Sequence, residues 1–318
     1  MIDEGPLVSV IVYNYNYGKY LRQCFDSLLA QTCKDIEILF SDNASEDDSW
    51  EIALEYQREY PNMFHVVRNR KNYGTEANLM NCHVAMKGKF YCVIGSDDVL
   101  HPEYVETCLR TMLDDDKVMY AMTHRYILTA DGKTQQELPF YDGSYKLYPP
   151  SQNLVYMMAA INPSISQIMY RRTPKPYIRD IFNGQFYATR IADFMLCLKH
   201  PVTYINRALV GHRIHGENQS LVANENLLEI IGPYVLLHQF QELARPYEFD
   251  QVIKKYPDAV VNLSRLSLRY AYRAFNQDNE ALFRRYFFLA QALHPEICEE
   301  NMFKILAKLE LKVTPEAV

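Results

Sequence analysis

The chain has 318 residues, of which 48% are hydrophobic and 23% are charged. This composition is typical of a globular protein with a buried core and excludes intrinsic disorder. The 33 Lys and Arg residues face 39 Asp and Glu residues, which gives a formal net charge of −6. Such a balance predicts no nucleic-acid partner, because a phosphate polymer needs a positive field. The length indicates about two domains.

The cysteines and the apolar segments indicate the compartment. Seven cysteines without a CxxC pair are typical of free thiols in a reducing environment. The first residues have neither the basic region nor the long apolar region of a secretory signal. No stretch approaches the ~18 uninterrupted apolar residues of a spanning helix. We therefore expect a cytoplasmic protein, and any membrane contact would be peripheral, at the inner face of the cell membrane.

The first hundred residues alternate between strand patterns and helix patterns. The strand patterns are continuous apolar, β-branched runs, and the helix patterns repeat apolar residues at a period near 3.6. The predicted strands are residues 7–13, 36–42, 65–69 and 90–95, and the predicted helices are residues 20–29, 45–60 and 74–87. This alternation predicts an α/β fold whose sheet is mostly parallel and joined by crossover helices.

The pattern changes after residue 100. A helix is predicted near 102–114, a strand follows over 118–128, and a loop rich in Tyr and Pro extends to Pro150. From about residue 224 the pattern is helical throughout. The helical segments lie near 224–243, 258–275, 279–293 and 296–310. We expect an α/β domain over 1–222, divided into halves 1–100 and 101–222, and a helical accessory domain over 223–318.

Polar residues follow three of the predicted strands, at the sheet edge where parallel sheets bind ligands. They are Asn14-Tyr15-Asn16, Asp42-Asn43-Ala44-Ser45 and Ser96-Asp97-Asp98. A helix cap explains the second group equally well. The adjacent carboxylates of Asp97 and Asp98 repel each other unless a cation or solvent neutralises them, and hard divalent cations take oxygen ligands. A solvated turn is the alternative for this pair.

Other nucleotide and hydrolase motifs are missing. No two glycines are two residues apart, so the dinucleotide-binding GxGxxG pattern is absent. Gly132-Lys133-Thr134 resembles the end of a phosphate-binding loop, but Ile127 stands where that loop needs its first glycine. Neither GxSxG nor HExxH occurs, which disfavours serine hydrolases and zinc proteases.

Six segments in a fixed order resemble glycosyltransferase family 2, a family of inverting enzymes with a GT-A fold. The segments are VSVIVYNYN, EILFSDNASEDDS, NRKNYGTEANLMNC, GKFYCVIGSDD, IADFMLCL and HRIHGENQSL. The resemblance covers roughly residues 6–222. It implies a GT-A type sheet, mostly parallel and flanked by helices, with the helical extension following it. It also assigns nucleotide binding to residues 1–100 and the acceptor to residues 101–222.

The resemblance implies a donor site and a cation site. Asp42 matches the residue that hydrogen-bonds uracil or another base, and an acceptor there would take a ring N–H. The implied nucleotide-binding residues are Val12, Tyr13, Asn14, Asp42, Asn72, Ser96 and Asp97. Asp98 would bind Mn²⁺ or Mg²⁺ on the diphosphate, and His215 would complete that metal site. His215 is otherwise an ordinary loop or core residue. Gly95 replaces the Asp of the commoner motif, which leaves the ribose contact unassigned.

The resemblance makes Asp193 the catalytic base. Direct displacement at the anomeric carbon needs a base within reach of the acceptor hydroxyl, on the face opposite the leaving diphosphate. Ala192 stands where many relatives carry Glu, so Asp193 alone fills the role locally. From the residues alone, a helix-face charge or a helix cap is the alternative.

The implied function is metal-dependent, inverting transfer of a hexose or N-acetylhexosamine from a nucleotide sugar to an acceptor hydroxyl. We expect a UDP sugar and an acceptor in bacterial surface-glycan or glycoprotein assembly, which would be a glycan, glycolipid or glycoprotein. Two other classes stay open: a non-catalytic GT-A binding or scaffold protein, and a nucleotidyltransferase. Because Asp98 and Asp193 are both present, the sequence favours the enzyme over the scaffold.

The helical tail carries two further expectations. Arg265, Arg269 and Arg273 share one helix face, which could hold anionic lipid headgroups or a lipid-diphosphate acceptor. A solvated or salt-bridged face is the alternative. An oligomer formed through the C-terminal helices also stays open.

Overall fold

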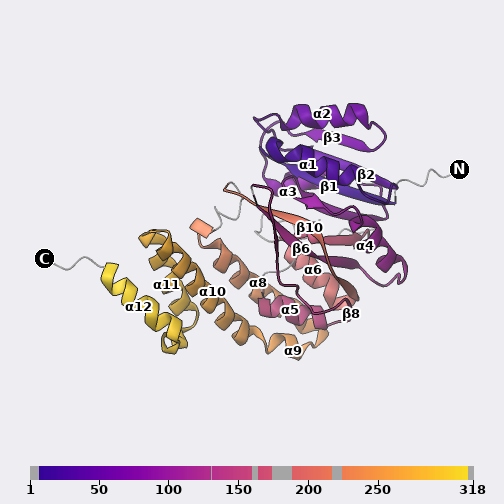
Figure 1. Cartoon of the computed structure of the whole chain (residues 1–318). Coiled ribbons are helices and arrows are strands. Elements are labelled where there is room, and N and C mark those ends of the chain that lie inside the picture. The colour runs from indigo at the N-terminus through magenta and orange to yellow at the C-terminus, as the bar shows by residue number, and fades with distance from the viewer. Residues whose placement is uncertain (1–6, 130, 160–163, 174–187, 217–223, 314–318) are drawn as a thin grey trace. The chain divides into compact units, whose positions relative to one another are not determined.

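The computed structural model describes residues 7–129, 131–159, 164–173, 188–216 and 224–313. The chain forms two compact units, coloured by residue number in Figure 1. The first unit comprises Met1–Pro149, Pro163–Ala192 and Lys199–His215. The second comprises Pro150–Asn162, Asp193–Leu198 and Gly216–Val318. The predicted helical domain 223–318 falls within the second unit, and the boundary at 222 stays a prediction.

The first unit is built on one mixed sheet, whose described strands run in the order β3-β2-β1-β4-β9-β6-β10-β5. Strand β7 pairs with β6, and β8 pairs with β10. The strands are β1 (Val8–Asn14), β2 (Ile36–Asp42), β3 (Phe64–Arg68), β4 (Phe90–Gly95), β5 (Val99–Leu100), β6 (Tyr120–Thr129), β7 (Thr134–Gln136), β8 (Tyr145–Leu147), β9 (Ile168–Arg171) and β10 (Val202–Ile214). The main run β3-β2-β1-β4 is parallel, which confirms the expected α/β fold class.

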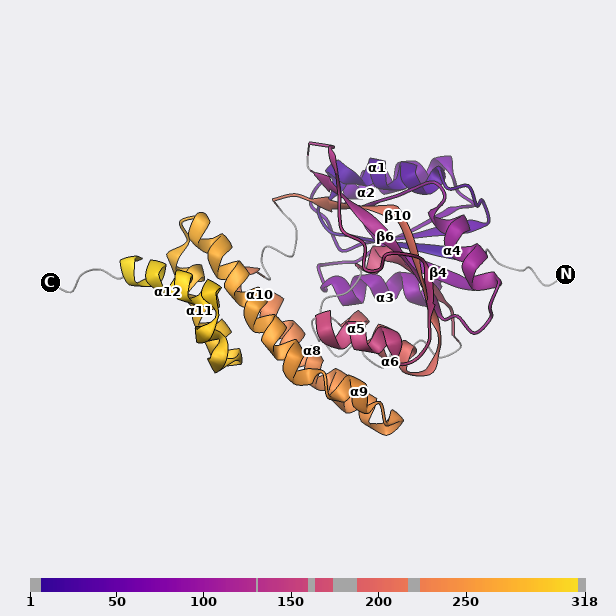
Figure 2. The same ribbon diagram turned by 60° about the horizontal axis from the view of Figure 1, so that its bottom comes forward.

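Helices α1 (Gly18–Leu29), α2 (Ser49–Glu59) and α3 (Thr75–Ala85) cover this parallel run, and α4 (Tyr104–Leu113) packs against β6, β9 and β10. Figure 2 shows α1 and α2 on one face of the sheet and α3 on the other. Since both faces are covered, β1, β2 and β4 are almost entirely buried, as continuous apolar strands require.

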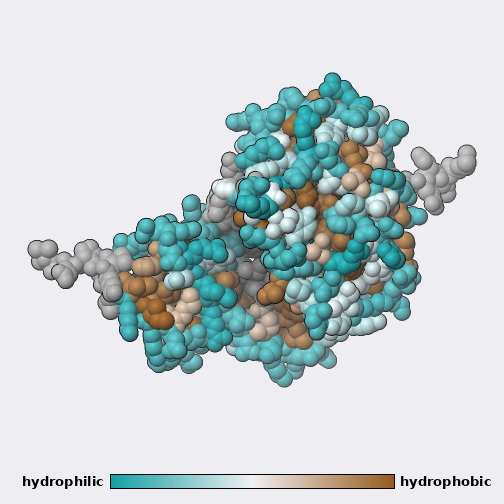
Figure 3. All heavy atoms as spheres, in the orientation of Figure 1, coloured by the Kyte–Doolittle hydropathy of each residue, from teal (hydrophilic) through white to brown (hydrophobic). Residues whose placement is uncertain are grey.

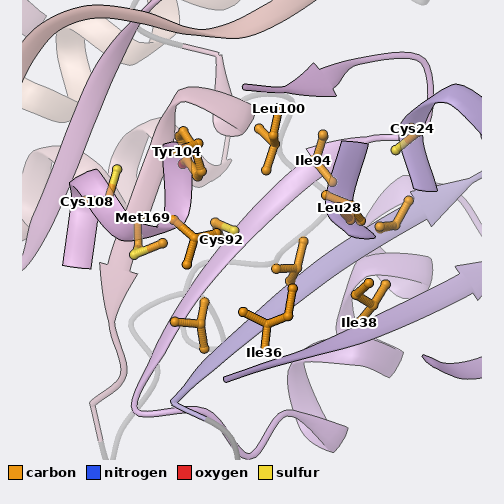
Figure 4. Close-up of a cluster of buried hydrophobic side chains, with 14 of the residues drawn as sticks. Cys24, Leu28, Ile36, Ile38, Cys92, Ile94, Leu100, Tyr104, Cys108 and Met169 are labelled. Carbon is orange, nitrogen blue, oxygen red and sulfur yellow. The ribbon is translucent and has the colours of Figure 1, made fainter. Parts of the chain in front are cut away.

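The core of the first unit follows the two-residue period of the strands. Val8, Val10 and Val12 of β1 enter one core cluster with apolar side chains of α1, α2 and α4. Figure 4 shows part of this cluster, in which Ile36 and Ile38 of β2 lie among side chains from β4 and the helices. On the other face, Cys82 of α3 contacts the backbone of β2, its sulfur 3.3 Å from the Leu39 carbonyl oxygen.

The carboxyl ends of the parallel strands therefore meet at one edge of the sheet. The pairing register places Asn14 opposite Asp42, and Tyr13 opposite Gly95. Polar residues from three separate segments come together at this edge, as the position of the predicted strands implied.

The second unit is helical. Its described helices are α5 (Ser151–Ala159), α8 (Leu228–Ala244), α9 (Asp250–Ile253), α10 (Tyr256–Asn276), α11 (Glu280–Leu293) and α12 (Asn301–Val313), with short 3-10 turns η2 (Arg245–Tyr247) and η3 (Pro295–Glu299). Helix α6 (Ala188–Lys199) contributes Asp193–Leu198 to this unit. Helices α10 and α11 share an apolar core that includes Leu268, Phe283 and Phe287.

Surface features of the second unit bear on the expectations for the tail. Arg265 forms an ion pair with Glu300, and Arg273 lies over the ring of Tyr270, so this face is at least partly engaged within the unit. Apolar atoms gather over α11 and α12 in Figure 3, where Phe288 and Ile305 are exposed. None of the described helices combines the length and the apolar character that crossing a membrane requires.

Candidate active site

Strand β4 ends at Gly95 in a tight turn that carries Ser96, Asp97 and Asp98. The Asp98 amide donates to the Gly95 carbonyl oxygen over 3.0 Å and closes the turn. A Cβ atom at residue 95 would stand 2.8 Å from Oδ1 of Asp97. The glycine that departs from the commoner family motif therefore makes room for the Asp97 carboxylate to fold back over the end of the strand.

Strand β10 brings a second group of side chains to this turn. It pairs with β5 directly after the turn, with Gly211 opposite Val99. As a result, His212 Nδ1 lies 3.1 Å from Asp98 Oδ1, and the Arg213 amide donates to the same oxygen over 3.0 Å. His215 Nε2 lies 3.1 Å from Asp97 Oδ2. Each carboxylate thus has its own histidine.

The 3-10 turn η1 (Ile165–Gln167) supplies a further contact to Asp98. The hydroxyl of Ser166 donates to Asp98 Oδ2 over 2.8 Å and accepts a bond from the Gly95 amide. Asp98 is 4% exposed, so both its oxygens are held in a buried position. His215 is also buried, with its ring packed against the rings of Tyr17 and Tyr20.

The turn is electrostatically suited to a positive charge. Burial raises the pKa of Asp97, and the neighbouring charge of Asp98 raises it further, while the hydrogen bond to His215 acts in the opposite direction. The Tyr13 phenol lies close enough to share this field: burial and the charges of both aspartates raise its pKa. A bound cation would relieve the repulsion between the two carboxylates.

A network of hydrogen-bonded polar side chains lies at the ends of β1 and β2. Asp42 is fully buried, and its Oδ1 accepts bonds from Asn14 Nδ2 and the Ser45 hydroxyl. Its Oδ2 accepts from the Ser45 amide over 3.0 Å and pairs with Arg68 Nε at 3.2 Å. Arg68 also lies over the ring of Trp50. Asp42 therefore orders the loop between β2 and α2 and already has donors at both oxygens.

Asparagines extend this network toward α3. Asn43 donates to Asn72 Oδ1 over 2.7 Å, and Asn69 donates to Asn43 Oδ1 over 2.9 Å. Asn78 of α3 donates to the carbonyl oxygens of Asn14 and Ser41. These bonds fix the segment 69–74 beside the ends of β1 and β2, with Asn72 itself exposed.

The remaining predicted residues differ in their surroundings. The Val12 side chain belongs to the apolar core, so only its backbone is available to a ligand. Ser96 is buried, and its hydroxyl has no hydrogen-bond partner among the described residues. Asp193 lies on α6 in the second unit and is 2% exposed.

The sequence did not single out Arg68, Ser166, His212 or Arg213. Arg68 carries a weak signal, since it ends a predicted strand as Asp42 does. The other three reach the acidic turn only through η1 and β10, which are distant in sequence from residue 98. For His212 and Arg213 a signal was present, because the resemblance placed His215 of the same segment, HRIHGENQSL, at the metal site. Ser166 had no such signal.

The acidic turn is chemically compatible with a divalent cation. Within the described part of the chain, no three His, Cys, Asp or Glu side chains form a ready-made ligand cluster. Mg²⁺ does not need one, because one or two carboxylates together with substrate phosphates commonly hold it. The carboxylates of Asp97 and Asp98 fit that pattern, and the imidazoles beside them would suit Mn²⁺.

The fold and the acidic turn at the end of β4 define an α/β protein of GT-A type. The chain belongs to glycosyltransferase family 2, since the family model described as Glycosyl transferase family 2 matches residues 9–174. EpsH of Bacillus subtilis (strain 168) is 39% identical over 226 residues, which cover 67% of this chain. Chondroitin synthase of Escherichia coli is 25% identical over 239 residues, or 73% of this chain. The chain spans 62% of the length of EpsH and 33% of that of the chondroitin synthase.

Solved structures support the same fold. TarS 1-349 of S. aureus, in complex with UDP-GlcNAc, aligns with a TM-score of 0.56 and 14% identity, covering 98% of this chain and 93% of TarS. The mannosyltransferase PcManGT of Pyrobaculum calidifontis, in complex with GDP-Man and Mn²⁺, aligns with a TM-score of 0.53 and 11% identity, covering 97% and 88%. At these identities the likeness concerns the fold.

Proposed function

We propose that this chain is a metal-dependent, inverting glycosyltransferase that moves a hexose or N-acetylhexosamine from a nucleotide sugar to an acceptor hydroxyl. The observation that carries the proposal is the Asp97–Asp98 pair at the carboxyl end of β4, in which Asp98 is buried and accepts a bond from Ser166, beside a cluster of polar side chains. Family membership and the nucleotide sugars bound by TarS and PcManGT support it.

Asp98 and Asp97 form the proposed cation site. Asp98 would hold Mn²⁺ or Mg²⁺. His215 would be a further ligand, and its Nε2 would then exchange its contact with Asp97 for one with the cation. When bound, the cation offsets the charge that develops on the leaving diphosphate. The residues of the turn contribute a fixed geometry, because Ser166, His212 and the Arg213 amide hold Asp98 on both oxygens.

The polar network at the ends of β1 and β2 is the proposed nucleotide site. We assign base recognition to Asp42 together with Arg68, whose side chain is partly exposed. We assign further nucleotide contacts to Tyr13, Asn14 and the Val12 backbone. Asn72 and Ser96 complete this set. A base N–H that reaches Asp42 would share or replace one of its present donors, since both oxygens are engaged. We favour a UDP sugar.

Asp193 is the proposed catalytic base. The acceptor oxygen attacks the anomeric carbon as the bond to the diphosphate oxygen breaks, and the acceptor proton passes to the Asp193 carboxylate. A single in-line displacement inverts the anomeric configuration. Nucleoside diphosphate leaves with the bonding electron pair.

The setting is also a proposal. A relative named chondroitin synthase supports a role in building a bacterial surface glycan or glycoprotein, so the acceptor would be a glycan, glycolipid or glycoprotein. We propose a cytoplasmic enzyme with peripheral contact to the inner face of the membrane. Exposed Phe288 and Ile305 support an oligomer formed through the C-terminal helices.

A donor screen tests the proposal. Purified protein is incubated with UDP and GDP sugars, with and without Mn²⁺, and the release of nucleoside diphosphate is measured. We expect release from one donor only when the cation is present, and a fall to background in Asp98→Ala. Asp250→Asn, on an exposed helix of the second unit, serves as the control substitution. Donor turnover that persists in Asp98→Ala, or turnover of nucleoside triphosphates instead, would contradict the proposal.

A further inference from the structure

Arg213 of β10 is a buried arginine beside the acidic turn, and the proposed chemistry does not use its side chain. The residue is 3% exposed. Its Nε donates to the backbone carbonyl oxygen of Asp97 over 2.7 Å. One terminal nitrogen donates to Gln23 Oε1, and the guanidinium carbon lies 4.7 Å from the centre of the Tyr20 ring. Gln23 and Tyr20 both belong to α1.

This arginine joins three segments that are far apart in the sequence. Its backbone amide binds the Asp98 carboxylate, its side chain binds the backbone of Asp97, and the end of that side chain is anchored on α1. The turn is therefore tied both to the strand behind it and to the helix beside it. A guanidinium can make such divergent bonds because its donors form a rigid planar fork.

Arg213 Nε binds the backbone carbonyl oxygen of Asp97, whereas the carboxylate oxygen Oδ2 of Asp97 lies 3.1 Å from His215 Nε2. Arg213 thus fixes the backbone of the turn through an atom that a cation does not need.

We propose that Arg213 is a positioning residue for the cation and the donor diphosphate, and that Gln23 is its anchor. It acts through the Asp97–Asp98 turn and does not itself touch the reacting atoms. Loss of the guanidinium frees the turn to shift, and the affinity for the cation falls. The inference rests on the proposed function, because it assumes that the turn binds a cation.

Mn²⁺ binding is the direct readout, measured by electron paramagnetic resonance of the free ion in a titration of the full chain without donor. We expect Arg213→Met to weaken Mn²⁺ binding by about tenfold, the loss typical of outer residues that orient metal ligands. Gln23→Leu should weaken it in the same direction by a smaller factor. Gln23→Glu should retain the affinity, because a carboxylate still accepts the bond from Arg213.

A control substitution and a comparison of two Gln23 variants make the result decisive. Arg22→Ala, at the adjacent position of α1, removes an exposed ion pair with Glu55 and should leave Mn²⁺ binding unchanged. If Arg213→Met does not fold, the comparison of Gln23→Leu with Gln23→Glu decides, since Gln23 is exposed on its helix. Equal Mn²⁺ affinity in the wild type and Gln23→Leu, with Arg213→Met also unchanged or unfolded, overturns the positioning role.

The Asp98→Ala variant separates this inference from the proposed function. If Asp98→Ala abolishes Mn²⁺ binding while the Arg213 and Gln23 variants bind normally, the positioning role alone is wrong. If Asp98→Ala binds Mn²⁺ as the wild type does, the turn is not the cation site and the proposed function fails with it. In steady-state kinetics, a positioning role raises the Mn²⁺ concentration for half-maximal rate in Gln23→Leu and leaves kcat at saturating Mn²⁺ nearly unchanged.

Discussion

At the scale of single residues, the candidate site depends on neighbours that either leave room for a carboxylate or bind it. Gly95 leaves the space that Asp97 occupies, and Ser166 binds both the Gly95 amide and Asp98. Arg68 pairs with a fully buried Asp42. A glycine, a serine and an arginine therefore set the conformations of three acidic side chains.

Gly95→Ala should separate the geometry of the turn from the stability of the fold. The added methyl group would stand 2.8 Å from Asp97 Oδ1, and a side-chain oxygen can move away at little cost. We expect Tm to change by only a few degrees while Mn²⁺ affinity falls several-fold, because Asp97 leaves its position against His215. Gly143→Ala, where the nearest atom belongs to a tyrosine side chain, is the matched control. Unchanged Mn²⁺ affinity would show that the position of Asp97 is irrelevant to the cation.

Arg68→Lys should weaken nucleotide binding although it preserves the charge. A lysine ammonium lacks the planar fork that reaches both the Asp42 carboxylate and the Ser45 carbonyl oxygen, and it stacks less well on Trp50. We expect UDP affinity, measured by calorimetry, to fall by about tenfold, with a loss of roughly 1 kcal/mol in the free energy of unfolding. Arg70→Lys, two residues along, is the control. Wild-type UDP affinity in Arg68→Lys would remove Arg68 from the nucleotide site.

At the scale of elements, the sequence predicted best those strands and helices whose surroundings stay the same along their whole length. Strands β1, β2 and β4 are buried on both faces, so their apolar runs were recognisable, and α1 and α2 pack apolar side chains against them. The helix predicted from residue 45 begins at Ser49 instead. Residues 43–48 form a hydrogen-bonded loop. The amide and the hydroxyl of Ser45 both donate to the Asp42 carboxylate, and Ala44 between them takes a positive φ of 62°.

The sequence did not predict strands β8, β9 and β10, whose pairing strands lie far away in the chain. Strands β8 and β9 have only three and four residues, and β10 reaches the sheet after helix α6. Strand β9 pairs with β4 and β6, β10 pairs with β6, and β8 pairs with β10, so every partner lies tens of residues away in the chain. Asp97 and Asp98 could therefore be predicted as a candidate site from their strand. The approach of His212 and Arg213 could be expected only from the resemblance, which placed His215 of the same segment at the metal site.

Helix α3 carries a titratable group that should make the stability of the fold depend on pH. Burial lowers the pKa of His83 to about 4, and the charge of Arg172 adds to the effect. A depressed histidine pKa means that the folded state favours the neutral ring, so this stability is present above the unfolded pKa of 6.5 and is lost as pH falls toward 4. The loss amounts to about 3 kcal/mol, from the cost of each pKa unit.

Substitution of His83 checks this pH dependence. His83→Phe keeps an edge-to-face contact with Tyr91 and removes the titrating group. Denaturant unfolding between pH 7 and pH 4 should then show a smaller decline in the free energy of unfolding than the wild type shows. His65→Phe, at an exposed position of β3, is the control. Parallel declines in the wild type and His83→Phe would rule out His83 as the source.

The contact of α10 with α11 should be sensitive to side-chain volume. Ser267 is fully buried and donates to the Tyr286 carbonyl oxygen over 2.7 Å, so a small polar residue fits between the two helices. Ser267→Ala should cost about 1 kcal/mol for the lost hydrogen bond. Ser267→Leu should cost more, roughly 1–3 kcal/mol from overpacking. Thermal unfolding measures both, and a Ser267→Leu variant as stable as Ser267→Ala would contradict close packing here.

At the scale of the whole molecule, the proposed catalytic groups are divided between the two units. Asp97, Asp98 and the residues of the proposed nucleotide site belong to the first unit, and Asp193 belongs to the second. Family membership rests on residues 9–174, which include the acidic turn and exclude Asp193. Donor binding and proton removal are therefore separable properties of the chain, and each can be tested without the other.

Asp193→Asn should abolish transfer and spare donor binding. An amide of nearly the same shape cannot accept the acceptor proton, so the transfer rate should fall by about 10²–10⁴, the usual contribution of a general base. UDP and Mn²⁺ affinities should stay at wild-type values, because their proposed ligands lie in the first unit. Asp250→Asn, at an exposed position of the second unit, controls for the loss of a negative charge. Transfer that survives in Asp193→Asn would leave the base unassigned while the donor site stands, whereas joint loss of transfer and UDP binding would point to a structural role for this buried carboxylate.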